Sequence, residues 1–317
     1  MCVGVALFLA ATTVACSRGE TARSGATEGS SAAADVATAL ESPAGAQSGE
    51  PFLFTDARGK VLMTWLEKRG DSRYALRFSA LSGNEWSTPT TIAERNDFFV
   101  NWADFPSVVR TESGRLVAHW LQKSGSSKYA YDVRISQSID DGRSWSPGSV
   151  LNRDGVQAEH GFVALWPSEG DRVGAAWLDG RASLAKDTTQ RATHVMTTSI
   201  SADGTLGAES TLDTRTCDCC QVAVAVASRG PIVAYRDRTS DETRDIVVTR
   251  RVNGKWSEPA LVHHDDWKIA ACPVNGPALS ARGDTVVIAW FTGAQDSARV
   301  RFARSVDGGT TFGAPTR

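Results

Sequence analysis

The chain lacks several features that would assign it to common functional classes. Its only long apolar run, Val3 to Ala11, is shorter than the roughly 20 residues of a membrane-spanning helix. Neither sign of charge is in excess, because 34 Lys and Arg stand against 36 Asp and Glu. No basic field is therefore available to neutralise a nucleic-acid backbone. The 317 residues predict a soluble folded body that does not bind nucleic acid.

Several enzyme signatures are absent as well. The sequence holds no His-Glu-x-x-His zinc motif, no Gly-x-Ser-x-Gly nucleophile motif and no glycine loop that would cradle a phosphate. Tyrosine is scarce, with four residues, whereas the chain has ten tryptophans and six cysteines. The positions of the tryptophans and cysteines in the chain are therefore informative about function.

The first 50 residues predict export and a tether. The apolar run closes on Thr13-Val14-Ala15-Cys16-Ser17, as a secretory signal does. This end resembles a bacterial lipobox, which implies a signal peptide at 1–16 and a lipid on Cys16; cleavage without lipid is the alternative. Residues 17–50 are almost entirely Ser, Ala, Gly, Thr and Glu, so we expect a disordered tether. The implied location is the cell envelope, in the periplasm or at the outer membrane, as a membrane-anchored lipoprotein.

The remaining residues, 51–317, repeat one unit five times. Each copy has an apolar strand that ends in an aromatic residue, and consecutive aromatics lie 55 to 58 positions apart. A glycine five to seven positions earlier supplies the tight turn into each of these strands. The five aromatics are Trp65, Trp120, Trp177, Tyr235 and Trp290.

Each unit predicts three further strands. A short apolar strand precedes the aromatic-ended one, and an alternating strand such as 74–78, 132–136 or 299–303 follows it. An aromatic-small-x-Pro element such as Trp86 to Pro89 then closes the unit. The sequence therefore predicts an all-β protein, a β-propeller of four-stranded antiparallel blades, with a β-sandwich or solenoid as the alternative.

Two hairpins carry a more specific pattern, Ser-x-Asp-x-Gly-x-x-aromatic, at 138–145 and 305–312. The pattern resembles the Asp box, or BNR repeat, of the sialidase-like β-propellers, and it falls between the third and fourth strands as in that family. In the family the aspartate ties the turn together and the aromatic packs between strands. The structural residues implied here are Ser138, Asp140, Gly142, Trp145, Ser305, Asp307, Gly309 and Phe312.

The number of blades is open at this stage. The resemblance implies six blades, whereas the sequence shows five units. We expect a six-bladed propeller that lacks its last blade, and a five-bladed ring is the alternative.

Strand order separates the loops onto two faces. Turns between strands one and two, and between three and four, share the face with the Asp boxes. The loops between strands two and three lie on the other face with the blade-to-blade connections, and most of the reactive side chains fall there. Paired carboxyl groups on this face would serve glycosidic acid/base chemistry. The candidates are Asp104, Glu159, Asp179 and Asp237.

The same face offers groups that could bind a sugar. An Arg fork matches the carboxylate of an acidic sugar, and an exposed Trp can stack on a sugar ring. The substrate-binding candidates are Arg181, Arg236, Arg238, His160, Trp102 and Asn275. Two alternatives stay open: Arg236 and Asp237 pair with Arg244 and Asp245 in an ion-pair network, or His160 is an ordinary polar residue of the channel.

The resemblance also implies a mechanism for a true sialidase. Family sialidases hold the substrate carboxylate with three arginines, use a Tyr assisted by Glu as nucleophile, and use an Asp as acid/base. The early Phe-Arg-Ile-Pro motif of the family is missing from the first unit. Tyr235 stands where the other units have a strand-ending Trp, so we expect it to serve packing.

Four cysteines lie in two successive blade connections of the candidate face: Cys217, Cys219, Cys220 and Cys272. Two disulfides that tie the fourth and fifth inner strands together are the first interpretation. Three of the four lie within four residues, which makes normal disulfide geometry hard to satisfy. The alternatives are thiolate ligation of copper(I) or zinc, with His160 or Asp218 nearby, and a redox pair.

Taken together, these features predict an exported sialidase-like propeller that acts on an anionic glycan or glycoconjugate. The activity implied by the resemblance is exo-α-sialidase or a related glycoside hydrolase, with no cofactor and no metal. The alternative is a non-catalytic binding module of the surface or periplasm, whose Cys-rich site holds disulfides or copper or zinc.

Overall fold

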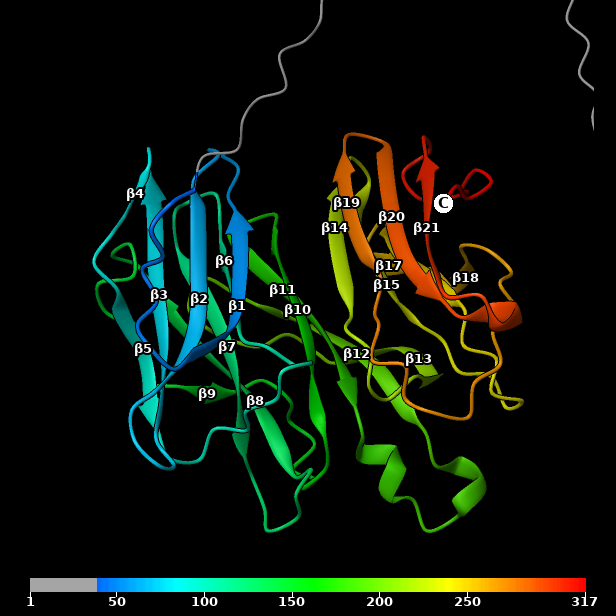
Figure 1. Ribbon diagram of the computed structural model, residues 1–317, viewed down its shortest axis with the longest axis horizontal. Helices are drawn as coiled ribbons and strands as arrows, with labels where there is room; N and C mark the ends of the chain where they lie inside the picture. Colours follow the sequence, from blue (N-terminus) through cyan, green and yellow to red (C-terminus); the bar gives the residue numbers. More distant parts are fainter. Residues whose placement is uncertain (1–38) are drawn as a thin grey trace, which may run out of the picture. The chain divides into compact units, whose positions relative to one another are not determined.

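A computed structural model describes residues 39–317 of the chain (Figure 1). The signal peptide, Cys16 and most of the predicted tether lie outside the described residues. The first strand begins at Ser48, three positions before the predicted start of the propeller at 51. In the described part of the chain, no helix has the length and apolar character that crossing a bilayer requires.

The described residues form five antiparallel sheets that follow one another along the chain (Figure 1). The first sheet holds β1 (Ser48–Thr55), β2 (Val61–Lys68), β3 (Tyr74–Ser82), β4 (Glu85–Trp86) and β5 (Thr90–Arg95). The second holds β6 (Ser107–Arg110), β7 (Leu116–Lys123), β8 (Tyr131–Ser138) and β9 (Ser149–Val150). The third holds β10 (His160–Ser168), β11 (Arg172–Asp179), β12 (Thr193–Ile200) and β13 (Ser210–Thr216).

The last two sheets complete the set. The fourth holds β14 (Ala223–Ala227), β15 (Gly230–Arg236), β16 (Ile246–Val252), β17 (Lys255–Trp256) and β18 (Ala260–Leu261). The fifth holds β19 (Ala278–Arg282), β20 (Thr285–Thr292) and β21 (Arg299–Ser305), with a bridge from Phe302 to Thr316 where a fourth strand would pair. Short 3-10 segments lie at Arg181–Leu184, Thr188–Gln190 and Ala294–Asp296.

The repeat found in the sequence corresponds to these sheets. Each predicted aromatic-ended strand is the second strand of its sheet, namely β2, β7, β11, β15 and β20. Trp65, Trp177 and Tyr235 are among the largest fully buried side chains, which is the packing role expected of these positions. The prediction of an all-β propeller of antiparallel blades is confirmed, and a six-bladed propeller that lacks its last blade stays a prediction.

The hydrophobic core lies between neighbouring sheets. Four buried clusters join the first sheet to the second, the second to the third, the third to the fourth and the fourth to the fifth. The first strands of the sheets, β1, β6, β10, β14 and β19, pack beside one another in that order. This arrangement lines a central channel with inner strands and presents the loops at its two ends.

The two Ser-x-Asp-x-Gly turns share one set of hydrogen bonds. The Ser138 hydroxyl donates to Asp140 Oδ1 over 2.8 Å and accepts the Gly142 amide, while Asp140 accepts the Ser144 amide. Ser305, Asp307 and Gly309 repeat this pattern. These bonds lower the pKa of both aspartates, led by Ser144 at Asp140 and by the Thr311 amide at Asp307.

Each of these turns also rests on the preceding sheet. A Cβ atom on Gly142 would lie 2.4 Å from the ring of Phe78 in β3, and one on Gly309 would lie 2.8 Å from Ile232 in β15. The ring of Trp145 meets Phe78 edge-on at 5.6 Å. The turns therefore join neighbouring blades as well as closing their own hairpins.

Candidate functional site

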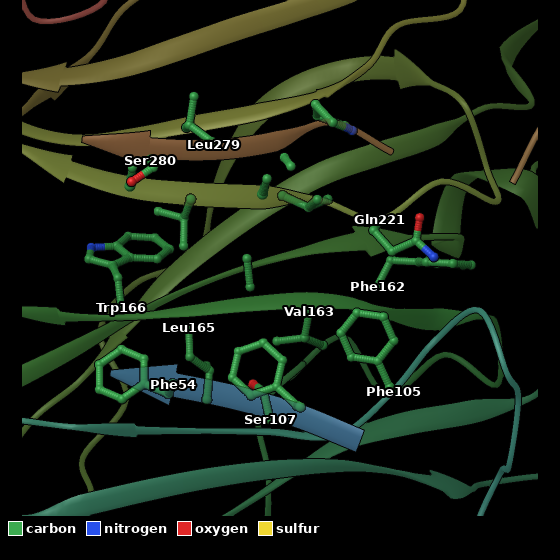
Figure 2. Close-up of a pocket in the computed structure, with 18 of the residues that line it drawn as sticks. Phe54, Phe105, Ser107, Phe162, Val163, Leu165, Trp166, Gln221, Leu279 and Ser280 are labelled. Atoms are coloured by element: carbon green, nitrogen blue, oxygen red, sulfur yellow. The ribbon is translucent and has the colours of Figure 1, made fainter. Parts of the chain in front are cut away.

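A cavity of about 640 Å³ runs along the inner strands of all five sheets. Figure 2 shows Gln221, Phe105 and Phe162 together at one end and Phe54 and Trp166 at the other. Its lining is mainly apolar, with aromatic rings from several blades. The end near Gln221 belongs to the predicted functional face, because blade connections meet there.

The side chain of Gln221 spans two blade connections at this end of the channel. Its amide nitrogen donates to the Ala103 carbonyl over 2.7 Å, and its amide oxygen accepts the Gly276 N–H over 3.1 Å. These three residues belong to the connections that lead into β14, β6 and β19. One side chain thus ties three blades together over the channel mouth.

Asp104 lies directly at this mouth and lines the cavity. Only 4% of the residue is exposed, and neither carboxyl oxygen makes a hydrogen bond to any described residue. Burial raises the pKa of Asp104 to about 8; the nearby Phe162 amide opposes this rise and the charge of Glu159 adds to it. Asp104 therefore carries its proton at neutral pH, as a general acid must.

Glu159 is partly buried, and it is the carboxyl group whose charge acts on Asp104. It accepts a 2.8 Å hydrogen bond from the hydroxyl of Tyr131. Burial raises the pKa of Glu159, the Tyr131 bond opposes this, and the charge of Asp218 adds to the rise. The charge of Glu159 thus raises the proton affinity of Asp104, and an influence of this kind separates the roles of paired carboxyl groups.

Tyr131 was not among the predicted site residues. Tyr235 was the tyrosine compared with the nucleophile of the sialidases. Tyr131 is fully buried and stacks on Phe99 with ring centroids 3.9 Å apart. In this position it orients Glu159 and does not reach the cavity as a nucleophile. Tyr235 is also fully buried and donates to Asp213 over 2.9 Å, in line with its expected packing role.

Asp179 and Arg181 form a closed ion-pair cluster with His160. Asp179 is fully buried and accepts hydrogen bonds from Trp177 and from Arg181. Burial would raise the pKa of Asp179, but the Arg181 hydrogen bonds and the charge of His160 lower it overall. An ionised and fully bonded carboxylate is poorly suited to acid/base duty, so Asp179 is here a structural partner of Arg181.

His160 is equally enclosed. It is fully buried, with Nδ1 3.0 Å from the Tyr131 carbonyl oxygen and Nε2 3.0 Å from Asp154 Oδ2. Donor atoms of Asp154, His160 and Asp179 lie close enough for a metal ion. However, the guanidinium of Arg181 bonds both carboxylates and takes the place of a cation. His160 therefore matches the alternative of a structural polar residue.

The guanidinium of Arg236 is held by backbone carbonyls. The residue is 1% exposed, and its guanidinium donates to the carbonyls of Arg244, Asn275 and Phe291. It also lies 4.9 Å from the ring centroid of Trp267. The predicted pairing with Asp245 is not formed, because Asp245 accepts three backbone amides instead. Arg236 is a scaffold for the loops, and a direct contact with substrate would require that scaffold to open.

Arg238 is the most accessible of the three predicted arginines. Its side chain is 29% exposed, donates to both oxygens of Glu242 and lies 3.7 Å from Asp218. The neighbouring Asp237 accepts the Arg238 amide, and burial raises the pKa of Asp237 to about 6. Asp237 and Arg238 thus place two ionisable groups beside the mouth. An anion that binds Arg238 would have to displace Glu242 from it.

The remaining predicted binding residues differ in accessibility. Trp102 is 75% exposed on the turn next to Ala103, so its indole is open for stacking. Asn275 is exposed, and its side-chain amide donates to the Pro273 carbonyl over 2.6 Å. The structure thus brings Trp102, Asp104, Glu159 and Arg238 to one face, while Asp179, His160 and Arg236 support it from within.

The four cysteines do converge as predicted, but only one disulfide is present among them. Cys219 and Cys272 are bonded, whereas Cys217 and Cys220 are free and buried. The Sγ atoms of Cys217 and Cys220 lie 3.3 Å apart. The expectation of two disulfides is therefore met for one pair only, and the bond joins the connections into β14 and β19.

No protein-family model matches the chain, and a comparison with curated proteins found no match. Solved structures do resemble it. A protein of unknown function from Dyadobacter fermentans DSM 18053 has a TM-score of 0.58 and 10% identity, covering 85% of this chain and 82% of its own. The Hadza microbial sialidase Hz136 has a TM-score of 0.52 and 16% identity, covering 85% of this chain.

The likeness to the sialidase covers only 58% of that protein's length. A third structure, a PL25 ulvan lyase bound to a GlcA–Rha3S saccharide, has a TM-score of 0.52 and 12% identity, covering 85% of this chain and 69% of its own. At these identities the likenesses show a shared propeller fold. The chemistry of this chain has to be argued from its own residues.

Proposed function

We propose that this protein is a propeller glycoside hydrolase whose active site is the channel mouth around Asp104 and Glu159. The observation that carries the proposal is Asp104: an unpartnered carboxyl group, buried at the mouth of the central cavity, with a pKa raised to about 8. Two structural neighbours, a sialidase and an ulvan lyase, act on glycans, which supports this class of substrate.

The two carboxyl groups would take different roles. Asp104 would protonate the glycosidic oxygen as general acid, because it holds a proton at neutral pH. Glu159, oriented by Tyr131, would act from the other side of the scissile bond. It would either activate a water molecule as a base or attack the anomeric carbon as a nucleophile. Trp102 would stack on the sugar ring at the rim.

The finer proposal is an anionic glycan such as a sialoside, taken by an exported, lipid-anchored protein. Arg238 supports it as the accessible guanidinium beside the mouth, since it can exchange Glu242 for a substrate carboxylate. Arg181 is already paired with three carboxylates of the protein. Arg236 already donates hydrogen bonds to three backbone carbonyls. Recognition of the anion thus depends chiefly on Arg238 and does not use the arginine triad of the sialidases.

A panel of fluorogenic acidic and neutral glycosides tests the proposal. We expect turnover by the wild type and a loss of at least about a hundredfold in Asp104→Asn and in Glu159→Gln. Asp71→Asn is the matched control, because Asp71 is an exposed carboxylate on a loop of the same face. Absence of turnover across the whole panel, with binding absent too, would contradict the proposal.

A second candidate is a non-catalytic glycan-binding module. The hydrogen bonds of Gln221 across the mouth and the exposure of Trp102 favour it, since an exposed indole at the rim can bind a sugar outside the cavity. Binding of glycans that Asp104→Asn leaves intact, without turnover, would select this candidate. Its form with copper or zinc would use Cys217 and Cys220, the two free thiols among the described residues.

A further inference from the structure

The cysteine cluster contains two reacting partners side by side, a dithiol and a disulfide. Cys217 Sγ lies 3.3 Å from Cys220 Sγ and 3.7 Å from Cys219 Sγ, which is already bonded to Cys272. Exchange between thiols and disulfides proceeds by attack of a thiolate on a disulfide sulfur. The sulfur atoms of Cys217 and Cys219 are thus at van der Waals contact, with no atom between them at that separation.

The surroundings of Cys217 favour its thiolate. Arg244 Nη1 lies 3.2 Å from its sulfur. The hydrogen bond from Cys220 and the charge of Arg244 lower the pKa of Cys217 to about 6, although burial opposes them. The same hydrogen bond and burial raise the pKa of Cys220, so the two thiols differ strongly in acidity. A low-pKa thiol followed by a protonated one is the pattern of a nucleophile and its resolving partner.

The two free thiols and the disulfide differ in their exposure to solvent. Cys217 and Cys220 are each 1% exposed, so an outside reagent does not reach them. Cys272 is exposed and Cys219 is partly exposed. Any external thiol or disulfide therefore meets the Cys219–Cys272 pair first.

We propose that the four cysteines form a thiol–disulfide relay, through which the buried Cys217/Cys220 dithiol reduces an external disulfide at Cys272. This site is separate from the proposed glycosidase chemistry and does not depend on it. The co-substrate class is a small-molecule or protein disulfide that can reach an exposed thiolate.

The steps balance without any further reagent. Cys217 thiolate attacks Cys219 Sγ, a Cys217–Cys219 bond forms, and Cys272 leaves as a thiolate. Cys220 gives up its proton and attacks Cys217, which expels Cys219 and leaves a Cys217–Cys220 disulfide. The freed Cys219 and Cys272 then reduce the external disulfide to two thiols and are themselves reoxidised to a disulfide. The protein gains one disulfide, and the external disulfide gains two electrons, the proton that Cys220 gives up and one proton from water.

A chromogenic aryl disulfide, 5,5′-dithiobis(2-nitrobenzoate), is a suitable probe with folded protein that holds one disulfide and two thiols. We expect the wild type to release about two equivalents of thionitrobenzoate and to end with no adduct. Cys217→Ser should release none on the same timescale, because Cys220 alone is enclosed. Cys220→Ser should release about one equivalent and keep one adduct, because Cys217 can still free Cys272 but nothing resolves the intermediate.

Peptide mapping of the Cys220→Ser adduct decides between a relay and direct access. The relay places the adduct on Cys272, whereas direct reaction would place it on Cys217. An adduct on Cys217, or equal release by the wild type and Cys217→Ser, would overturn the proposal. So would a metal ion retained by Cys217 and Cys220 through purification. The near-ultraviolet circular dichroism of the tryptophans verifies that each variant is folded.

Discussion

At the scale of single residues, burial decides which predicted side chains can act on a ligand. Asp104 and Asp179 were equivalent as sequence candidates, since both are carboxylates at the same face of the propeller. Asp179 has Arg181 and Trp177 as partners and a lowered pKa, whereas Asp104 has no hydrogen-bond partner and a pKa of about 8. Both residues are aspartates, so the residue type cannot separate their roles. The hydrogen-bond partners of each carboxyl group do.

Asp104 should make the stability of the fold depend on pH. Between the ordinary pKa of an aspartate and about 8, the folded state holds a proton that the unfolded state has lost. Stability should therefore fall as pH rises through this window. Relative to Asp104→Asn, we expect the wild type to lose up to about 1.4 kcal/mol per pH unit between pH 5 and 7. Urea unfolding of both proteins at several pH values measures this difference, and parallel curves would contradict it.

Trp102 should matter for a glycan and little for the fold. Its indole is 75% exposed, so Trp102→Ala removes a stacking surface without opening the core. We expect glycan affinity to fall about tenfold or more, and the melting temperature to stay within about 1–2 °C. Titration calorimetry and a thermal scan check both parts. Replacement of Ile139, an apolar residue on the other face that is even more exposed, is the control and should leave affinity unchanged.

At the scale of elements, the strands were predictable and the contacts between loops were not. Alternation and the strand-ending aromatics are local signals, so Val61–Trp65, for example, falls within β2. The bond from Gln221 to Ala103 joins residues 118 positions apart, and the partners of Arg236 come from three different segments. No local pattern encodes such contacts, which is why Arg236 was expected to bind substrate and instead holds the loops.

The Asp-box glycines provide a test of contacts between blades. Gly142 and Gly59 have nearly the same φ, 82° and 79°, but a Cβ atom would meet Phe78 at Gly142 and no atom within 4 Å at Gly59. Gly59→Ala should cost about 1 kcal/mol from backbone strain alone. Gly142→Ala should cost about 1–3 kcal/mol more, because Phe78 must move. Chemical denaturation measures the free energy of unfolding of both variants. Equal destabilisation would show that the close approach of Phe78 to Gly142 does not contribute to stability.

At the scale of the whole molecule, the core is a series of clusters between blades. The second, third and fourth sheets each contribute to two clusters, whereas the first and fifth each contribute to one. The burial patterns follow this: seven of the eight residues of β11 are buried, whereas those of β20 alternate. Stability should therefore be highest in the middle of the series.

Hydrogen exchange should reveal this gradient. We expect the amides of β10, β11 and β15 to exchange most slowly and those of β19, β20 and β21 to exchange at least about tenfold faster. Exchange followed by mass spectrometry of proteolytic peptides measures each strand. Uniform protection across the five sheets would indicate that the clusters unfold as one unit.

We propose that Asp104 acts as the general acid of a glycosidase at the channel mouth. The pH dependence of kcat/KM for a hydrolysed glycoside tests it most directly, because the acid must be protonated in the free enzyme. We predict that kcat/KM falls as pH rises through about 8, and that this descending limb is lost in the residual activity of Asp104→Asn. A limb that persists unchanged in Asp104→Asn would contradict the account.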